Sequence, residues 1–85
     1  MNLSEAREII NKNRVKGVAV IWCIEDYLNL EGKTVTLYGA MIVKDGVRVL
    51  TIPTDNDDIE FLVGVVSKYI AGIKVTQMIK EREER

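Results

Sequence analysis

Residues 33–53 read KTVTLYGAMIVKDGVRVLTIP, and this stretch decides the fold class. The turn lies at Lys44-Asp45-Gly46, where Asp-Gly supplies the positive φ angles that a two-residue hairpin turn requires. The runs on either side are rich in β-branched and aromatic residues, which is typical of strands. The stretch therefore predicts two antiparallel strands joined by a tight turn.

Both faces of this hairpin are apolar. One face holds Val35, Leu37, Met41, Val43, Leu50 and Ile52, and the other holds Tyr38, Ala40, Ile42, Val47 and Val49. A lone sheet in a small domain normally leaves one face to water. Two apolar faces indicate that the chain's own helix covers one side and that a partner covers the other.

A further strand is predicted at Val18–Ile24, and Glu31-Gly32 is expected to form the turn into the hairpin. A two-residue turn there places Trp22 opposite Met41. The face that a helix should cover then holds Trp22, Leu37, Met41 and Leu50. Asp26 conflicts with this register because it points into the same face. A β-bulge near Asp26, or an earlier end to the strand, resolves the conflict.

A helix is predicted before the strands and another after them. Asn2 or Ser4 can cap the first helix, and a loop over 11–17 follows it. Pro53 is expected to close the third strand because it cannot donate a ladder hydrogen bond. Thr54 or Asp55 then caps a second helix that begins near residue 56.

The second helix is apolar nearly all round. Its main stripe is Ile59, Leu62, Val63, Val66 and Ile70, and a second line is Phe61, Val65 and Tyr69. Gly72 is the expected C-cap. Residues 73–85 form a short helix, a strand or a frayed tail. The whole chain, 1–85, is thus expected to be a single α+β domain: an N-terminal helix, a three-stranded antiparallel β-meander, a second helix packed on one sheet face and a short C-terminal segment.

Composition narrows the classes of function. The 85 residues carry 12 basic and 13 acidic side chains, so no net field steers the chain toward nucleic acid or a membrane. The first residues do not show the charged-then-apolar pattern of a leader, so none is expected, and no apolar run approaches the length of about 18 residues that a membrane span needs. Because a single cysteine forms no intramolecular disulfide, a cytoplasmic protein is expected. Richness in Ile, Val, Glu and Lys is also typical of thermophile proteins.

Candidate reactive groups have simpler structural interpretations. The chain contains no histidine, the commonest general base and metal ligand near neutral pH, so no enzyme, cofactor or metal is predicted. Cys23 is interpreted as a buried strand residue. The acidic run Asp55–Glu60 favours helix capping, with a cation site as the alternative. Glu25 and Asp26 point to opposite faces of a strand, which disfavours an acid–base pair.

The expected order of elements resembles that of double-stranded-RNA-binding domains. Those domains grip phosphates with a basic N-terminal end of the second helix, whereas Asp55, Asp57 and Asp58 occupy that position here. Carboxylates there would repel phosphate, so the resemblance implies a fold and no RNA site. In size and arrangement the chain also resembles some small phage-encoded inhibitors of bacterial defence nucleases.

The predicted function is protein interaction without catalysis. A homodimer, or a complex with another protein, should cover the second sheet face and the outer line of the second helix. The candidate interface residues are Ile21, Tyr38, Ala40, Ile42, Val47, Val49, Phe61, Val65 and Tyr69. Nucleic-acid binding is the disfavoured alternative, and its candidate residues are Arg7, Lys12, Arg14, Lys16, Lys74, Lys80 and Arg82.

Overall fold

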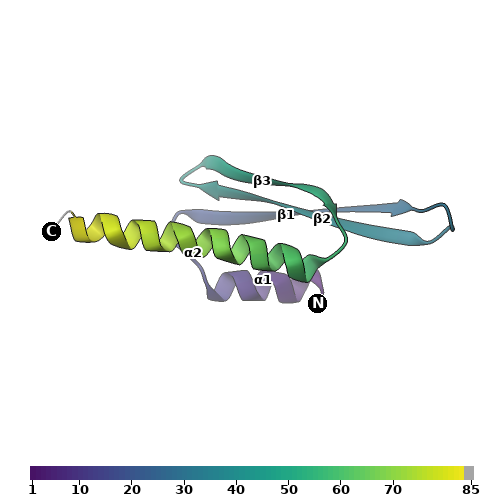
Figure 1. Ribbon diagram of the computed structural model, residues 1–85, viewed down its shortest axis with the longest axis horizontal. Helices are drawn as coiled ribbons and strands as arrows, with labels where there is room; N and C mark the ends of the chain where they lie inside the picture. The colour runs from purple at the N-terminus through teal and green to yellow at the C-terminus, as the bar shows by residue number, and fades with distance from the viewer. Residues whose placement is uncertain (84–85) are drawn as a thin grey trace.

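The computed structural model describes residues 1–83 as two helices and a three-stranded sheet. The elements are α1 (Leu3–Lys12), β1 (Val18–Leu28), β2 (Thr34–Lys44), β3 (Val47–Asn56) and α2 (Ile59–Glu83). The strands are antiparallel in the order β1-β2-β3, and both helices lie on the same side of the sheet (Figure 1). This confirms the predicted α+β class and element order. Residues 84–85 of the predicted C-terminal segment lie outside the described residues.

The two layers of the molecule are offset along its long axis. The chain measures 60 × 22 × 15 Å. The tip of the β1–β2 hairpin extends past the helices at one end, and the C-terminal part of α2 extends past the sheet at the other (Figure 1). The helices therefore cover the sheet from the β2–β3 turn to its middle and leave the tip of the β1–β2 hairpin uncovered.

The helix α1 forms as its sequence predicts. The Asn2 side-chain oxygen accepts a hydrogen bond from the Glu5 backbone N–H at 2.9 Å, which satisfies one of the free N–H groups at the helix start. Ala6 and Ile10, one turn apart, are both buried against the rest of the core. The capping prediction is confirmed at Asn2.

The tight turn between β2 and β3 is also confirmed. Asp45 and Gly46 take φ angles of 49° and 80°, as a two-residue turn requires. Lys44 pairs with Val47 beside the turn, but farther along Ile42 pairs with Leu50, so Val49 is an extra residue in β3. Because of this β-bulge, Leu50 lies opposite Ile42, whereas a regular hairpin from the same turn would place it opposite Met41.

The turn between β1 and β2 is longer than predicted. It spans residues 29–33, and the Asn29 side-chain oxygen accepts hydrogen bonds from the backbone N–H groups of Glu31 and Lys33. Trp22 consequently pairs with Ala40, and the expected Trp22–Met41 pairing is wrong. A slip of one residue exchanges the two faces of β2 relative to β1, because successive side chains point to opposite sides.

The slip corrects the assignment of faces. Ala40 and Ile42, predicted to face a partner, are 0% exposed in the core. Leu37 and Met41, predicted to lie under a helix, fall at alternate positions of β2 and lie on the opposite side. The predictions for Trp22 and Leu50 are right, since both pack against the core cluster.

Asp26 needs no break in its strand. The strand β1 continues to Leu28, and Asp26 pairs with Thr36, whose hydroxyl donates a hydrogen bond to the carboxylate at 2.6 Å. The predicted bulge at Glu25-Asp26 is wrong. Asp26 is exposed because it lies in the part of the hairpin that extends past the helices.

The third strand crosses closely over Gly39. The register between β2 and β3 shifts after Ala40–Ile52, and Tyr38 pairs with Asn56, so β3 carries extra residues here. A Cβ on Gly39 would lie 2.7 Å from the Ile52 carbonyl oxygen and 2.8 Å from the Thr54 Cα. Pro53 lies within this irregular part of an edge strand and does not end it, contrary to the prediction.

The helix α2 begins later and runs farther than predicted. Asp58, and not Thr54 or Asp55, caps it: the carboxylate accepts from the Glu60 and Phe61 backbone N–H groups at 3.1 and 3.2 Å. Gly72 lies inside the helix and does not cap it. The Thr76 hydroxyl donates to the Gly72 carbonyl at 2.9 Å, within the continuing helix.

The core lies between the sheet and the two helices. Its buried members are Ala6, Ile10, Val15, Ala40, Ile42, Ile59, Leu62, Val63, Val66 and Ile70. Half of these residues come from α2, which is the main cover of the sheet. Burying an Ile or Leu side chain contributes about 1.5–3 kcal/mol, so this cluster is the main stabilising element of the domain.

Candidate interaction surface

The side of the sheet away from the helices is apolar. Because side chains alternate along a strand, the residues paired across β1 and β2 at odd-numbered positions share this side. We call it the open sheet face; its apolar residues are Ala19, Ile21, Cys23, Tyr27, Val35, Leu37, Met41 and Val43. Ile21 pairs with Met41 near its middle and is 47% exposed. No helix of the described chain lies against this side (Figure 1).

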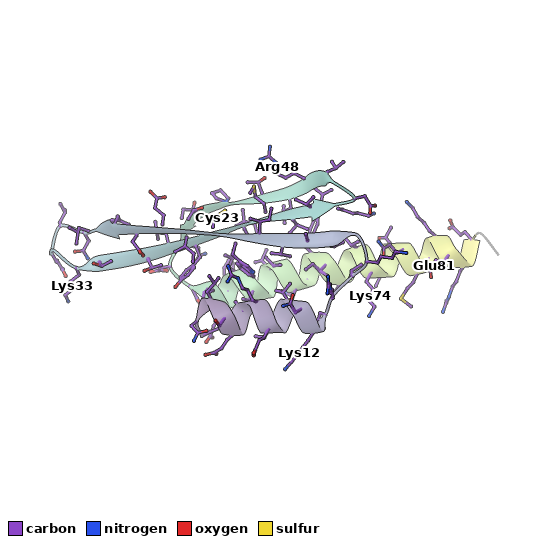
Figure 2. All side chains as sticks on the ribbon, turned by 180° about the vertical axis from the view of Figure 1, so that it is seen from behind. Lys12, Cys23, Lys33, Arg48, Lys74 and Glu81 are labelled. Carbon is purple, nitrogen blue, oxygen red and sulfur yellow. The ribbon has the colours of Figure 1, made fainter. Side chains whose placement is uncertain are left out.

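Charged groups border the open sheet face at two opposite places. Glu25 lies on the outer strand β1, paired with Leu37, toward the hairpin tip. Arg48 lies on the other outer strand, β3, paired with Val43 beside the tight turn, and Figure 2 shows its side chain directed away from the helices. Its guanidinium lies 3.9 Å from the Met41 sulfur. The centre of the face thus lies between one negative and one positive group.

Most of the predicted interface residues lie elsewhere. Of the nine, Ile21 alone falls on the open sheet face, and Ala40 and Ile42 are buried. Tyr38 and Tyr69 pack against the core, and the Tyr69 hydroxyl donates to the Val49 carbonyl at 3.3 Å. The other four residues lie on β3 near the tight turn or on α2: Val47, Val49, Phe61 and Val65.

Leu37, Met41 and Val43 were not predicted on this face because a two-residue turn was assumed between β1 and β2. Cys23 was not predicted there because it was interpreted as a buried residue, although it lies on the same side of β1 as Ile21. The signal for a longer turn was Asn29, three residues before Gly32. An Asn side chain often closes a longer turn, and Gly32 takes a φ of 76° there. A prediction with a five-residue turn in place of a two-residue turn gives the faces of β2 that the structure has.

Only some of the basic residues predicted to bind nucleic acid lie close to one another. Arg7 and Arg14 line one open groove of about 460 Å³ between α1 and β1, together with Trp22 and Ile70. Lys12 and Lys16 are exposed but do not line this groove. The other three predicted residues, Lys74, Lys80 and Arg82, lie on the C-terminal half of α2. The chain therefore brings two arginines together beside a tryptophan.

The acidic run after β3 acts in helix capping. Asn56 accepts a hydrogen bond from the Asp58 backbone N–H at 2.8 Å, and Asp58 caps α2. Within residues 1–83, no three Cys, Asp or Glu side chains gather in a way that would hold a metal ion. In the same residues, no helix is both long and apolar enough to cross a membrane.

The chain was compared with family models, curated proteins and solved structures, and none of them matches it.

Proposed function

We propose that this protein is a non-catalytic interaction module that self-associates through the open sheet face. The observation that carries the proposal is an apolar sheet side that no helix of residues 1–83 covers, with Ile21 and Met41 at its centre. Apolar sheet faces of this kind pack on a second sheet at about 10 Å in β-sandwiches. A second copy supplies such a sheet.

The placement of charge supports a second copy as the occupant. In a two-fold dimer the same patch meets itself, so each charged group must find an opposite group elsewhere on the patch. Glu25 and Arg48 lie on opposite outer strands and toward opposite ends of the face. A two-fold axis between them brings Glu25 of each copy toward Arg48 of the other, while the apolar centres stack.

The size of the face fits a modest dimer. From Val35 to Val43 the strand rises about 27 Å, at about 3.4 Å per residue, and three strands span roughly 14 Å. The projected footprint is therefore about 400 Å², and standing side chains add to it. Standard interfaces bury roughly 800 Å² per partner, so association is expected in the micromolar range of protein concentration.

Introducing a charge into the apolar centre of the face tests the proposal. Ile21→Glu places a carboxylate at the centre of the interface, where burial of a charge is costly. Met41→Glu places one beside Arg48, and burying that ion pair between two sheets also carries a large desolvation cost. Leu28→Glu is the matched control because Leu28 is also exposed but lies on the hairpin outside the open sheet face. Light scattering at micromolar concentration should give twice the 9.6 kDa chain mass for the wild type and the control, and the single mass for both face variants.

Circular dichroism should be unchanged in the face variants, since neither residue belongs to the buried core. A wild type that stays at the single-chain mass would overturn the proposal. So would face variants that associate as well as Leu28→Glu.

A nucleic-acid-binding function is the second candidate, and one observation favours it. Arg7 and Arg14 line the same groove as Trp22, so cationic groups and an aromatic ring lie close together. Phosphate contacts release counterions, and binding of an oligonucleotide should therefore weaken steeply with added salt. Fluorescence anisotropy of labelled single-stranded and duplex oligonucleotides at low salt tests it; a flat titration removes this candidate.

A further inference from the structure

The side of α2 that faces away from the sheet carries a second apolar surface. We call it the outer stripe of α2; its residues are Phe61, Gly64, Lys68, Gly72, Val75, Met78 and Ile79. Phe61, Val75 and Ile79 are 59%, 55% and 52% exposed. The core residues of α2, such as Leu62 and Val66, lie on the other side of the helix. The exposed large apolar side chains are Phe61 at one end and Val75, Met78 and Ile79 at the other, and they exceed what a solvated helix face needs.

Two glycines make the outer stripe receptive to another helix. A Cβ added at Gly64 or Gly72 would meet nothing within 4 Å among the described residues. Glycine in a helix interior costs about 1 kcal/mol relative to alanine, and the described chain supplies no close contact that offsets this cost. A bulky side chain of another molecule can occupy the space at each position.

We infer that the outer stripe binds the α2 helix of a second copy in antiparallel orientation. We place the two-fold axis at the level midway between Ile70 and Ala71 of each helix. Phe61 then lies within about one residue of the level of the second copy's Ile79. In the same alignment Gly64 lies level, within one residue, with Met78, and Gly72 with Lys68. Each glycine thus lies opposite a long side chain, and Phe61 lies opposite an aliphatic one.

Charge complementarity sets this orientation. Glu60 lies at the start of α2 beside the stripe, and Arg82 lies in its last turn. The antiparallel alignment brings these two groups together twice, once on each side of the two-fold axis. A parallel alignment would instead place Glu60 beside Glu60 and Arg82 beside Arg82. Within residues 1–83, Glu60 has one ionic partner, the Met1 amine at 3.6 Å.

This inference is independent of the proposed function, because the outer stripe and the open sheet face lie on opposite sides of the molecule (Figure 1). The stripe measures about 27 Å by roughly 10 Å, which is smaller than the open sheet face. It therefore belongs with the weaker, transient class of contacts. Two different two-fold surfaces on one chain join dimers into larger assemblies as concentration rises.

A charge-swap experiment tests association through the outer stripe. It uses a Met41→Glu background, in which association through the open sheet face is blocked. The background protein should dimerise at concentrations of hundreds of micromolar. Glu60→Arg and Arg82→Glu, each added alone, turn both ion pairs into repulsive pairs and should weaken association about tenfold. An equimolar mixture of the two variants restores both attractive pairs and should form a mixed dimer as stable as that of the background protein.

Glu81→Arg is the matched control. Glu81 precedes Arg82, but the helical turn places it away from the outer stripe, so association should persist. Sedimentation velocity across a concentration series measures all five samples. A background protein that stays monomeric throughout would overturn the inference, as would a mixture that associates no better than its two components.

Discussion

Gly39→Ala is the substitution for which the structure predicts the clearest loss of stability. The new methyl carbon would lie 2.7 Å from the Ile52 carbonyl oxygen, 2.7 Å from the Thr54 hydroxyl oxygen and 2.8 Å from the Thr54 Cα. Real Cβ atoms do not approach other atoms so closely. Two of these three atoms belong to the backbone of β3, so no side-chain rotation relieves the clash.

The cost follows from what must move. Either β3 shifts away from β2 or the bulged segment around Pro53 rearranges, and both break pairings on either side of Ala40–Ile52. Overpacking of a close-packed site costs about 1–3 kcal/mol. The unfolded chain also loses conformational freedom when glycine becomes alanine, which offsets about 0.4–1 kcal/mol of this loss. A net loss of about 1–2 kcal/mol is expected.

Urea unfolding followed by Trp22 fluorescence measures this loss. Gly64→Ala is the matched control because the same methyl group there meets nothing within 4 Å among residues 1–83. In an exposed helix it should raise the free energy of unfolding by about 0.5–1 kcal/mol. Equal or increased stability of Gly39→Ala would refute the described crossing of β3 over Gly39.

Substitutions at three further positions test the buried face of β2, its register and the cap of α2. Ile42→Ala should lower the free energy of unfolding by about 2–5 kcal/mol, since Ile42 is fully buried between the layers; a loss below 1 kcal/mol in urea unfolding would contradict the assigned faces. Ile42→Glu should abolish the cooperative thermal transition in circular dichroism, whereas Met41→Glu should retain it. A transition that is kept in Ile42→Glu and lost in Met41→Glu would instead support the register predicted from the sequence. Asp58→Ala should cost about 1 kcal/mol by removing the cap of α2, and Asp55→Ala should have little effect; equal losses in thermal unfolding would show that the cap is misplaced.

Local signals in the sequence predicted local structure well. The Asn2 cap, the Asp45-Gly46 turn and the apolar stripe of α2 from Ile59 to Ile70 all depend on residues within a few positions of one another. The order of elements followed from them. Each of these features is fixed by backbone φ angles or helical periodicity, which neighbouring residues determine.

The predicted faces of β2 were wrong because they depend on whether the turn between β1 and β2 contains an odd or an even number of residues. A strand has a side-chain period of two, so a five-residue turn at 29–33 in place of a two-residue turn reverses the faces of β2. The bulge at Val49 then restores Leu50 to the helix side. Nothing in the alternating apolar pattern distinguishes these registers, because both faces are apolar.

Tertiary context explains two other misses. Gly72 looked like a helix end, but Ile73 packs against the core and carries the helix onward. Pro53 looked like a strand end, but it lies in an edge strand at a bulge, where its missing N–H leaves no ladder bond unmade. In both cases packing against distant residues decided the structure.

Reactivity of Cys23 reports directly on burial of the open sheet face, because this thiol lies on that face and the chain contains no other cysteine. The rate of its modification by a thiol reagent is measured across a series of protein concentrations, with Met41→Glu as the control. A dimer through the open sheet face should give a rate that falls as the wild type associates and stays constant for the variant. Wild-type protein that reaches twice the chain mass while Cys23 reacts at an unchanged rate would show that the dimer uses another surface.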